Sequence, residues 1–192
     1  DGTTPLHWAV HVDSAVISEL LLDVGADATV ANRYGVRPIA LACTNGNADV
    51  IELLLDAGAN PNTMTAEGET ALMTASRTGA LDVVRMLLDR GADINASETW
   101  RGQTALMWAA AEGHAHLVPT MLSYGADISV RSSKGWSAML FAAREGQIDV
   151  VQTLLEAGAD VKDALPIIEE TRRGGTSAER AATGLSAFLL AA

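Results

Sequence analysis

The sequence predicts an all-α protein built from repeated pairs of short helices, and three observations support this prediction. Two glycine series share one period of 33 or 34 residues, which is the signature of a repeat architecture. In each unit a Val/Ile/Leu stripe, such as Leu81, Val84, Leu87 and Leu88, falls at helical spacing. Aromatic residues make up only 4% of the chain, so its core must come from many small, closely approaching helices. The series are Gly2, Gly35, Gly68, Gly102, Gly135 and Gly25, Gly58, Gly91, Gly125, Gly158.

The first helix of each unit follows the first glycine. In the first unit, the Thr4 hydroxyl can cap an orphan amide, and Pro5 suits the first helical position. A capping hydroxyl is also expected at Thr70, Thr104 and Ser137. The second unit has Arg37 at this position, and the missing cap should cost its helix about 1 kcal/mol.

A turn separates the two helices of each unit. It is expected at Asp13, Gly46, Gly79, Gly113 and Gly146. The second helix carries the apolar stripe and ends at the Gly-Ala-Asp/Asn tripeptide, whose glycine supplies the left-handed residue that ends helices and whose Asp or Asn forms a turn. Pro119 lies inside the second helix of the fourth unit, and we predict that this helix is kinked or irregular at its start.

The segment Gly2-Thr3-Thr4-Pro5-Leu6-His7, the period and the Gly-Ala-Asp tripeptides together resemble ankyrin repeats, over residues 1–163. The resemblance implies a solenoid of antiparallel helix pairs stacked side by side, with hairpin-like loops projecting at right angles. His7 is expected to make hydrogen bonds at the start of its helix. The other four units lack this histidine and must rely on packing instead. At its position they have Ala40, Met73, Met107 and Leu140.

We expect one continuous array. Its repeats are placed at about 1–31, 32–64, 65–98, 99–131 and 132–163, followed by an inserted loop at 164–183 and the start of a sixth repeat at 184–192. The last segment, Gly184-Leu185-Ser186-Ala187, aligns with Gly135-Trp136-Ser137-Ala138. A fragment of a longer array and a natural truncation both explain this ending.

The charge balance disfavours some partners. Acidic residues outnumber basic ones by 24 to 13, so nucleic acid and anionic membranes are unfavourable partners. No run of 18 apolar residues predicts a transmembrane helix, and no signal peptide is recognised. The compartment stays open: cytoplasmic by default, periplasmic or secreted if an upstream signal was removed. We expect a monomer.

Catalytic and cofactor-binding patterns are scarce, so we predict that the segment is not an enzyme and holds no cofactor or metal. His114 and His116 would point about 200° apart on a helix, which disfavours a shared metal. Cys43 is the only cysteine and stands where other units have a small residue, so it is predicted to be a buried spacer.

Binding to a protein is the remaining function, and the family's variable positions indicate which residues would carry it. Tyr, Trp and Arg among them are typical interface anchors, although Tyr34, Trp100 and Trp136 can equally pack across neighbouring loops. From the loop tips we select Arg33, Tyr34, Val36, Glu67, Glu69, Trp100, Arg101, Gln103, Lys134 and Trp136. From the ends of the first helices we select His11, Thr44, Asn45, Arg77, Thr78, Glu112, Arg144 and Glu145.

Two further features concern aromatic residues of this surface. The interval from Asp93 to Gly102 is one residue longer than its counterparts, which leaves the register at Thr99–Trp100 open. The first helices share one position that carries an aromatic ring in three units, and these rings are expected to pack in the core or on the groove floor. They belong to Trp8, Trp108 and Phe141.

Three functions are compatible with these residues. The leading prediction is a non-catalytic module that binds a partner protein through its loop tips and concave helix face. The alternative is a structural spacer in a larger protein whose activity lies elsewhere. The third is a ligand site or enzyme in the groove, using Arg77, Glu112 and Arg144, although alternating charges there also form ordinary inter-repeat ion pairs.

Overall fold

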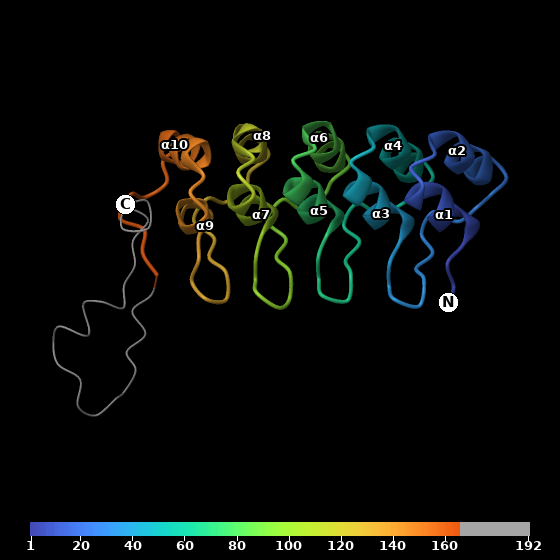
Figure 1. Ribbon diagram of the computed structural model, residues 1–192, viewed down its shortest axis with the longest axis horizontal. Coiled ribbons are helices and arrows are strands. Elements are labelled where there is room, and N and C mark those ends of the chain that lie inside the picture. Colours follow the sequence, from blue (N-terminus) through green and yellow to red (C-terminus); the bar gives the residue numbers. More distant parts are fainter. Residues whose placement is uncertain (166–192) are drawn as a thin grey trace, which may run out of the picture.

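A computed structural model describes residues 1–165 as five stacked pairs of helices (Figure 1). The first helices of the pairs form one layer and the second helices form the other. The first layer comprises α1 (Pro5–His11), α3 (Pro38–Asn45), α5 (Ala71–Thr78), α7 (Ala105–Ala111) and α9 (Ala138–Arg144). The second layer comprises α2 (Ala15–Asp23), α4 (Ala48–Asp56), α6 (Leu81–Asp89), α8 (Val118–Ser123) and α10 (Ile148–Glu156). Most of the predicted inserted loop, and all of the predicted sixth repeat, lie outside the described residues.

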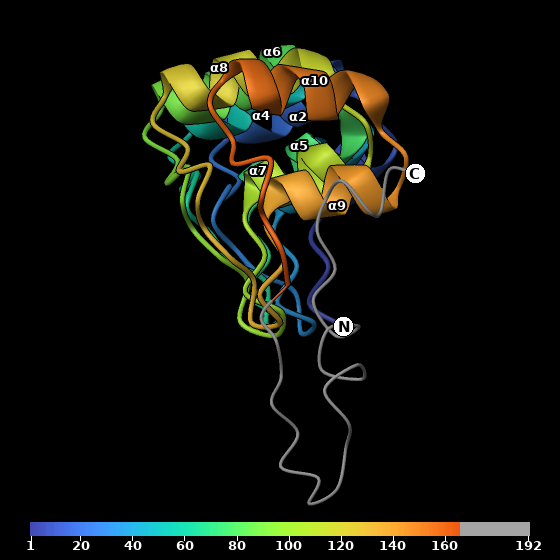
Figure 2. The ribbon, with the colours of Figure 1, turned by 90° about the vertical axis from the view of Figure 1, so that its left-hand side faces the viewer.

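Successive pairs are joined by loops that project away from both helix layers, as Figures 1 and 2 show. Each loop folds back as a hairpin closed by a backbone hydrogen bond, for example from Thr65 N–H to Glu69 C=O at 2.9 Å. Isolated antiparallel bridges join Met64 to Thr70 and Ser97 to Thr104. Within residues 1–165 these bridges do not extend into strands, so the all-α class is confirmed.

Side-chain caps start three of the five first helices. The hydroxyls of Thr4, Thr70 and Ser137 accept the amides of His7, Met73 and Leu140. Arg37 forms no such cap, as predicted.

The prediction of a cap at Thr104 was wrong. Its backbone has the extended geometry of an N-cap residue, but its side chain makes no capping bond. Helix α7 still starts there because Ala105, Leu106 and Met107 are each 2% exposed, so packing stabilises its first turn.

His7 links the start of α1 to the next hairpin. Its Nδ1 lies 2.8 Å from the Thr4 hydroxyl, and its Nε2 donates to the Val36 carbonyl at 3.0 Å. The ring is buried, so both nitrogens need these partners. At the same position Met107 and Leu140 are buried in the core, which confirms that packing replaces the histidine there. Met73 is also buried, but its Sδ accepts the Thr70 amide at 3.4 Å, so the expected loss of a hydrogen-bonding group was wrong for this unit. Ala40 is half-buried.

Every second helix ends in the turn that the tripeptides predicted. The five tripeptide glycines all have φ between +84° and +92°, a region that disfavours a side chain. Each following Asp or Asn accepts the backbone N–H two residues later, as Asp27 does from Thr29 at 2.7 Å. Hydrogen bonds from the Thr29 hydroxyl and amide also lower the pKa of Asp27. These residues are therefore turn-formers, as predicted.

The core runs as a continuous column through the stack. First helices contact one another through small side chains, which allow their backbones to approach closely. The central alanine of each is at most 3% exposed: Ala9, Ala42, Ala75, Ala109 and Ala142. A larger side chain is buried in the second helices α4, α6 and α10 and just before α8, where Val50, Val83, Val150 and Leu117 are at most 1% exposed. Their counterpart in α2, Ile17, is 48% exposed.

Polar side chains also connect successive units. The His114 Nε2–H donates to the Arg77 carbonyl at 2.9 Å, and Gln147 donates to the Ala111 carbonyl at 3.1 Å. On the opposite edge, Asn62 donates to the Gly91 carbonyl and accepts from the Asp93 amide. These bonds satisfy backbone groups that helix ends leave unpaired.

The predicted irregularity at Pro119 is confirmed. A short 3-10 helix, η1 (Ala115–Leu117), precedes α8, and Pro119 is the second residue of α8. Proline is tolerated there because the amides of the first helical turn have no intrahelical acceptor. Helix α8 therefore has six residues, whereas the other second helices have nine.

Replacing Pro119 with Gln should extend α8 toward Ala115. Gln152 stands at this position in the fifth unit, where the helix is regular. The new amide can donate to the Ala115 carbonyl, so amides around residues 118–121 should exchange with solvent more slowly. Hydrogen exchange followed by NMR measures this change. Unaltered exchange rates would show that the proline does not cause the 3-10 turn.

Candidate protein-binding face

The hairpins and the first helices share one surface, which we call the inner face. Side chains from the two elements meet across it, because Glu69 of a hairpin contacts Thr74 and Arg77 of α5. All eighteen candidate binding residues lie on hairpins or at the ends of first helices. Fourteen of them are exposed, and four are half-buried: Val36, Glu69, Gln103 and Trp136.

One cluster of the inner face lies between the third and fourth units. The Thr74 hydroxyl donates to Glu69 Oε1 at 3.0 Å, and Arg77 Nη2 lies 3.8 Å from the same oxygen. The Arg77 guanidinium also sits 5.4 Å from the centre of the Trp108 ring. Arg77 is therefore held between an acid and an indole, and its side chain stays 42% exposed.

A second cluster lies on the fifth unit. The rings of Trp136 and Phe141 are 5.4 Å apart, and the Arg144 guanidinium lies 4.8 and 5.2 Å from their centres. Arg144 Nη2 also pairs with Glu145 at 2.5 Å. Trp136 thus packs on its own unit and exposes only part of its ring, which places it on the floor of the inner face.

Tyr34 and Trp100 stand at hairpin tips and are 61% and 77% exposed. Each ring is flanked by the arginine next to it. The Arg33 guanidinium lies 4.8 Å from the Tyr34 ring and donates to its hydroxyl, and the Arg101 guanidinium lies 5.4 Å from the Trp100 ring. Both tips therefore present an aromatic ring and a cation together.

Hydrogen bonds between neighbouring hairpins identify the extra residue in the Trp100 loop. The Thr99 amide donates to the Glu67 carbonyl, as Ser133 donates to Arg101 and Arg33 to Asp1. Thr99 is therefore the counterpart of Arg33 and Ser133, and Arg101 is the residue before the loop glycine. The additional residue is Trp100.

The Glu98 carboxylate holds this longer tip. It accepts backbone N–H groups from Trp100 and Arg101 at 2.7 Å and from Gln103 at 3.1 Å. Burial opposes its charged form, but these bonds and the Arg101 charge outweigh burial and lower the pKa of Glu98. The hairpin that carries Trp100 is thus ordered by a charged side chain.

The other hairpins use an uncharged side chain at the same position. Asn32 accepts the Tyr34 and Val36 amides, Thr65 accepts from Glu69, and Ser132 accepts from Trp136. The sequence patterns did not predict this set. The signal was present as a residue with a side-chain acceptor just before each loop tip, but only the folded hairpin shows what it binds.

The three aromatic residues that share one position of the first helices differ in burial. Phe141 is 6% exposed and Trp108 is partly buried, as expected. The prediction that Trp8 packs in the core or on the groove floor was wrong, because it is 58% exposed. Arg77 of the preceding unit covers Trp108, whereas no preceding unit lies beside α1 in the described chain.

Several candidate residues have free side chains. Glu67, Glu112 and Lys134 are exposed and make no side-chain hydrogen bond or ion pair with any described residue. Asn45 instead donates to the Val10 carbonyl at 2.9 Å, and the Thr44 hydroxyl donates to the Ala40 carbonyl. The first three residues are thus available to a partner, while Asn45 links its unit to the first unit and Thr44 bonds within its own helix.

The structure brings no catalytic set together among residues 1–165. No group of three His, Cys, Asp or Glu residues that could hold a metal ion is found there. Burial raises the pKa of Cys43 to about 12, so its thiol is protonated at neutral pH and acts as the predicted buried spacer. None of the described helices is long and apolar enough to cross a membrane.

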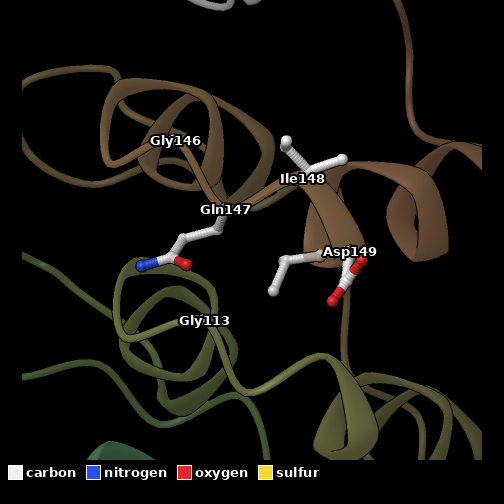
Figure 3. A pocket seen from close by; sticks show the side chains of 6 residues that line it. Gly113, Gly146, Gln147, Ile148 and Asp149 are labelled. Atoms are coloured by element: carbon white, nitrogen blue, oxygen red, sulfur yellow. The ribbon is translucent and has the colours of Figure 1, made fainter.

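Figure 3 shows a hollow between the fourth and fifth units, where the Gln147 side chain extends over Gly113. A Cβ on Gly113 would lie 2.4 Å from Gln147 Oε1. Among residues 1–165, Asp149 is the only ionisable side chain that lines this hollow. The hollow is therefore a point of close inter-repeat contact, and the described residues offer no acid–base pair there.

Substituting Gly113 with Ala should destabilise the protein more than the matched change Gly125→Ala. Both glycines have positive φ, +82° and +87°, so each alanine costs about 1 kcal/mol of backbone strain. At Gly113 the new methyl group also displaces Gln147 from the Ala111 carbonyl, at about 1 kcal/mol more. Urea denaturation of both variants gives the difference. Equal losses would contradict the role of this contact.

Replacing Glu98 with Gln should loosen the Trp100 tip without unfolding the helices, because an amide keeps one acceptor oxygen and places an NH2 against a backbone N–H. The expected local cost is about 2 kcal/mol. Amide exchange at Trp100, Arg101 and Gln103 should accelerate, while far-ultraviolet circular dichroism stays unchanged.

Acidification should have a similar effect on the wild-type tip. Because the pKa of Glu98 is lower in the folded state, its carboxylate stabilises the tip at neutral pH. This contribution decreases as the pH falls below the ordinary glutamate range and through the lowered pKa. The same exchange measurement at several pH values should therefore show acid-dependent loosening that Glu98→Gln lacks. An equal pH dependence in the variant would contradict this assignment.

Comparison with protein families agrees with this architecture. The family model described as "Ankyrin repeats (3 copies)" matches residues 6–98 and 96–164. A comparison with curated proteins finds no match. Ankyrin repeats generally mediate protein–protein interactions and are typically non-catalytic. The two matches cover most of the chain, and the chain belongs to the ankyrin-repeat family.

Proposed function

We propose that this protein binds a partner protein through its inner face, with the hairpin tips as the main anchors. The observation that carries the proposal is Trp100, an additional residue in its hairpin that leaves its indole 77% exposed. An exposed indole contributes little to folding, but burial in a partner would remove a large apolar area from water.

The tip is ordered before any partner arrives. Glu98 accepts three backbone amides of the Trp100 loop, and Thr99 is bonded to the neighbouring hairpin through both its amide and its hydroxyl. A loop that is already held in one conformation loses less entropy on binding. This order favours a recognition element over an incidental exposed side chain.

The two clusters of the inner face extend this surface along the stack. Arg77 lies over Trp108, and Arg144 lies over Trp136 two units further along. Arginine and tryptophan are the residue types that most often dominate binding energy. We therefore infer that a partner contacts several units, with the tips at one edge and the Arg–Trp pairs at the centre.

The double variant Tyr34→Ala, Trp100→Ala tests this proposal. Both side chains are largely exposed, so the melting temperature should stay close to that of the wild type. Binding partners are captured from an extract of the source organism, and affinities for the purified partner are then measured by calorimetry. We expect the double variant to bind at least about tenfold more weakly.

The matched control is Tyr124→Ala, Ile148→Ala. These residues are 40% and 79% exposed and belong to the ends of second helices, away from the hairpin tips. The control should bind like the wild type. If the two double variants retain equal affinity, the tips do not carry binding, and the proposal fails.

A further inference from the structure

Charge is distributed unevenly between the two sides of the stack. The second helices and the turns that end them hold 13 acidic and 2 basic residues, within 15–27, 48–60, 81–93, 115–127 and 148–160. The other residues among 1–165 include 8 acidic and 8 basic ones. The excess of acid therefore lies on the second-helix side, whereas the remainder, which includes the inner face, is neutral as a whole.

The hairpin tips lie at the opposite edge of the stack from this acidic side. Figure 2 shows the hairpins extending from the first-helix layer, away from the second helices. The first-helix layer between them is about 10 Å thick, and charges are screened over about 8 Å at physiological ionic strength. The second-helix side therefore repels an acidic molecule only weakly at the tips, while it attracts basic molecules to itself.

Two cations and one indole gather on the hairpins of the fourth and fifth units. The Ser133 amide donates to the Arg101 carbonyl at 2.7 Å, which sets Lys134 beside the neighbouring tip. The Arg101 guanidinium lies 5.4 Å from the centre of the Trp100 ring. Trp100, Arg101 and Lys134 are all exposed, and we call these three residues the tip cluster.

The cations of the tip cluster are not matched by acids of their own protein. Four other arginines among residues 1–165 pair with a carboxylate: Arg77, Arg90, Arg131 and Arg144. Within the same range Arg101 and Lys134 form no ion pair. Glu98 attracts Arg101 but gives its oxygens to three backbone N–H groups. Both cations can therefore bind a carboxylate of another molecule without breaking an existing ion pair.

The neighbouring hairpin of the third unit carries the opposite charge. Glu67 is exposed there, and its backbone carbonyl accepts both the amide and the hydroxyl of Thr99. An acidic molecule on the tip cluster is repelled on the Glu67 side and attracted on the Lys134 side. The row of tips thus favours a placement of acidic groups over the fourth and fifth units.

We propose that the tip cluster binds an acidic segment of the partner protein, in which an apolar side chain lies beside Asp or Glu. This inference rests on the proposed function, since it names the chemistry of the partner that the inner face takes. The apolar side chain covers the Trp100 indole, and the carboxylates pair with Arg101 and Lys134. A guanidinium suits this role because its planar donors match a carboxylate.

The test uses the full 192-residue chain and phage that display random peptides of about 12 residues, which span about 40 Å when extended. Phage that bind the wild type but not Trp100→Ala are retained, so the selected peptides depend on the cluster. We expect them to carry a net negative charge and an apolar residue beside an acid. Neutral or basic peptides would refute the acidic partner and leave the inner-face function intact. The absence of any Trp100-dependent peptide would contradict both.

Charge-removing variants then test the ion pairs with a labelled selected peptide. Fluorescence anisotropy should show that Arg101→Gln, Lys134→Gln binds it about tenfold more weakly. The matched control Arg85→Gln, Lys162→Gln removes the same two charges from exposed positions on α6 and in the turn after α10, and it should bind normally. Equal weakening in both variants would show that net charge alone attracts the peptide, and the proposal would fail.

A gain of binding provides a readout that structural damage does not give. Glu67→Gln removes the repulsive charge beside the cluster and should strengthen binding of the same peptide about twofold to threefold. Unchanged or weaker binding would contradict the placement over the fourth and fifth units. Amide exchange at Trp100 and Arg101 verifies that the tip keeps its order in each variant.

A nucleic acid is the other anionic occupant that the experiment distinguishes. A labelled single-stranded oligonucleotide, matched to the peptide in negative charge, should bind at least about tenfold more weakly, because its phosphates place no apolar side chain on Trp100. Oligonucleotide binding as tight as that of the peptide, and weakened by Arg101→Gln, Lys134→Gln, would assign the cluster to phosphate and overturn the proposal.

Discussion

In each described helix pair after the first, one apolar side chain of the second helix, or of the turn just before it, is buried in the stack, and the rest of the structure depends on this burial. Val50, Val83, Leu117 and Val150 are almost completely removed from water, whereas Ile17, which no described pair precedes, is half exposed. A single pair cannot bury both of its faces, so stability comes from the interfaces between units. The small alanines of the first helices permit the close spacing that these interfaces require.

Because the helices supply the core, the hairpins can vary in sequence and length. They contribute few residues to the core, and each is held by one hydrogen-bonding side chain at its base. Glu98 can therefore support a tip with one additional residue, Trp100, without interrupting the stack of helix pairs. The same stack presents a mixed aromatic and charged inner face along its hairpins and first helices.

Predictions from local chemistry were correct where a residue and its sequence neighbours determine the backbone conformation. The left-handed glycines, the Asx turns and the interruption at Pro119 all follow from backbone limits of single residues. Predictions were wrong where packing against residues distant in the sequence determines the outcome. Thr104 has the right side chain for a cap but makes none, because buried packing already stabilises its helix. Trp8 occupies the position of Trp108 and Phe141, but it is 58% exposed because no preceding unit is among the described residues.

The amino-acid sequence by itself determined the repeat, the order of the helices and the family, because these follow from periodic glycines and apolar stripes. It also indicated which residues reach the surface. Only the tertiary structure decided that Trp100 is the additional residue, that Glu98 holds it, and that Arg77 lies over Trp108. These facts depend on hydrogen bonds and contacts between residues of different units, and no local pattern specifies which partners the folded stack brings together.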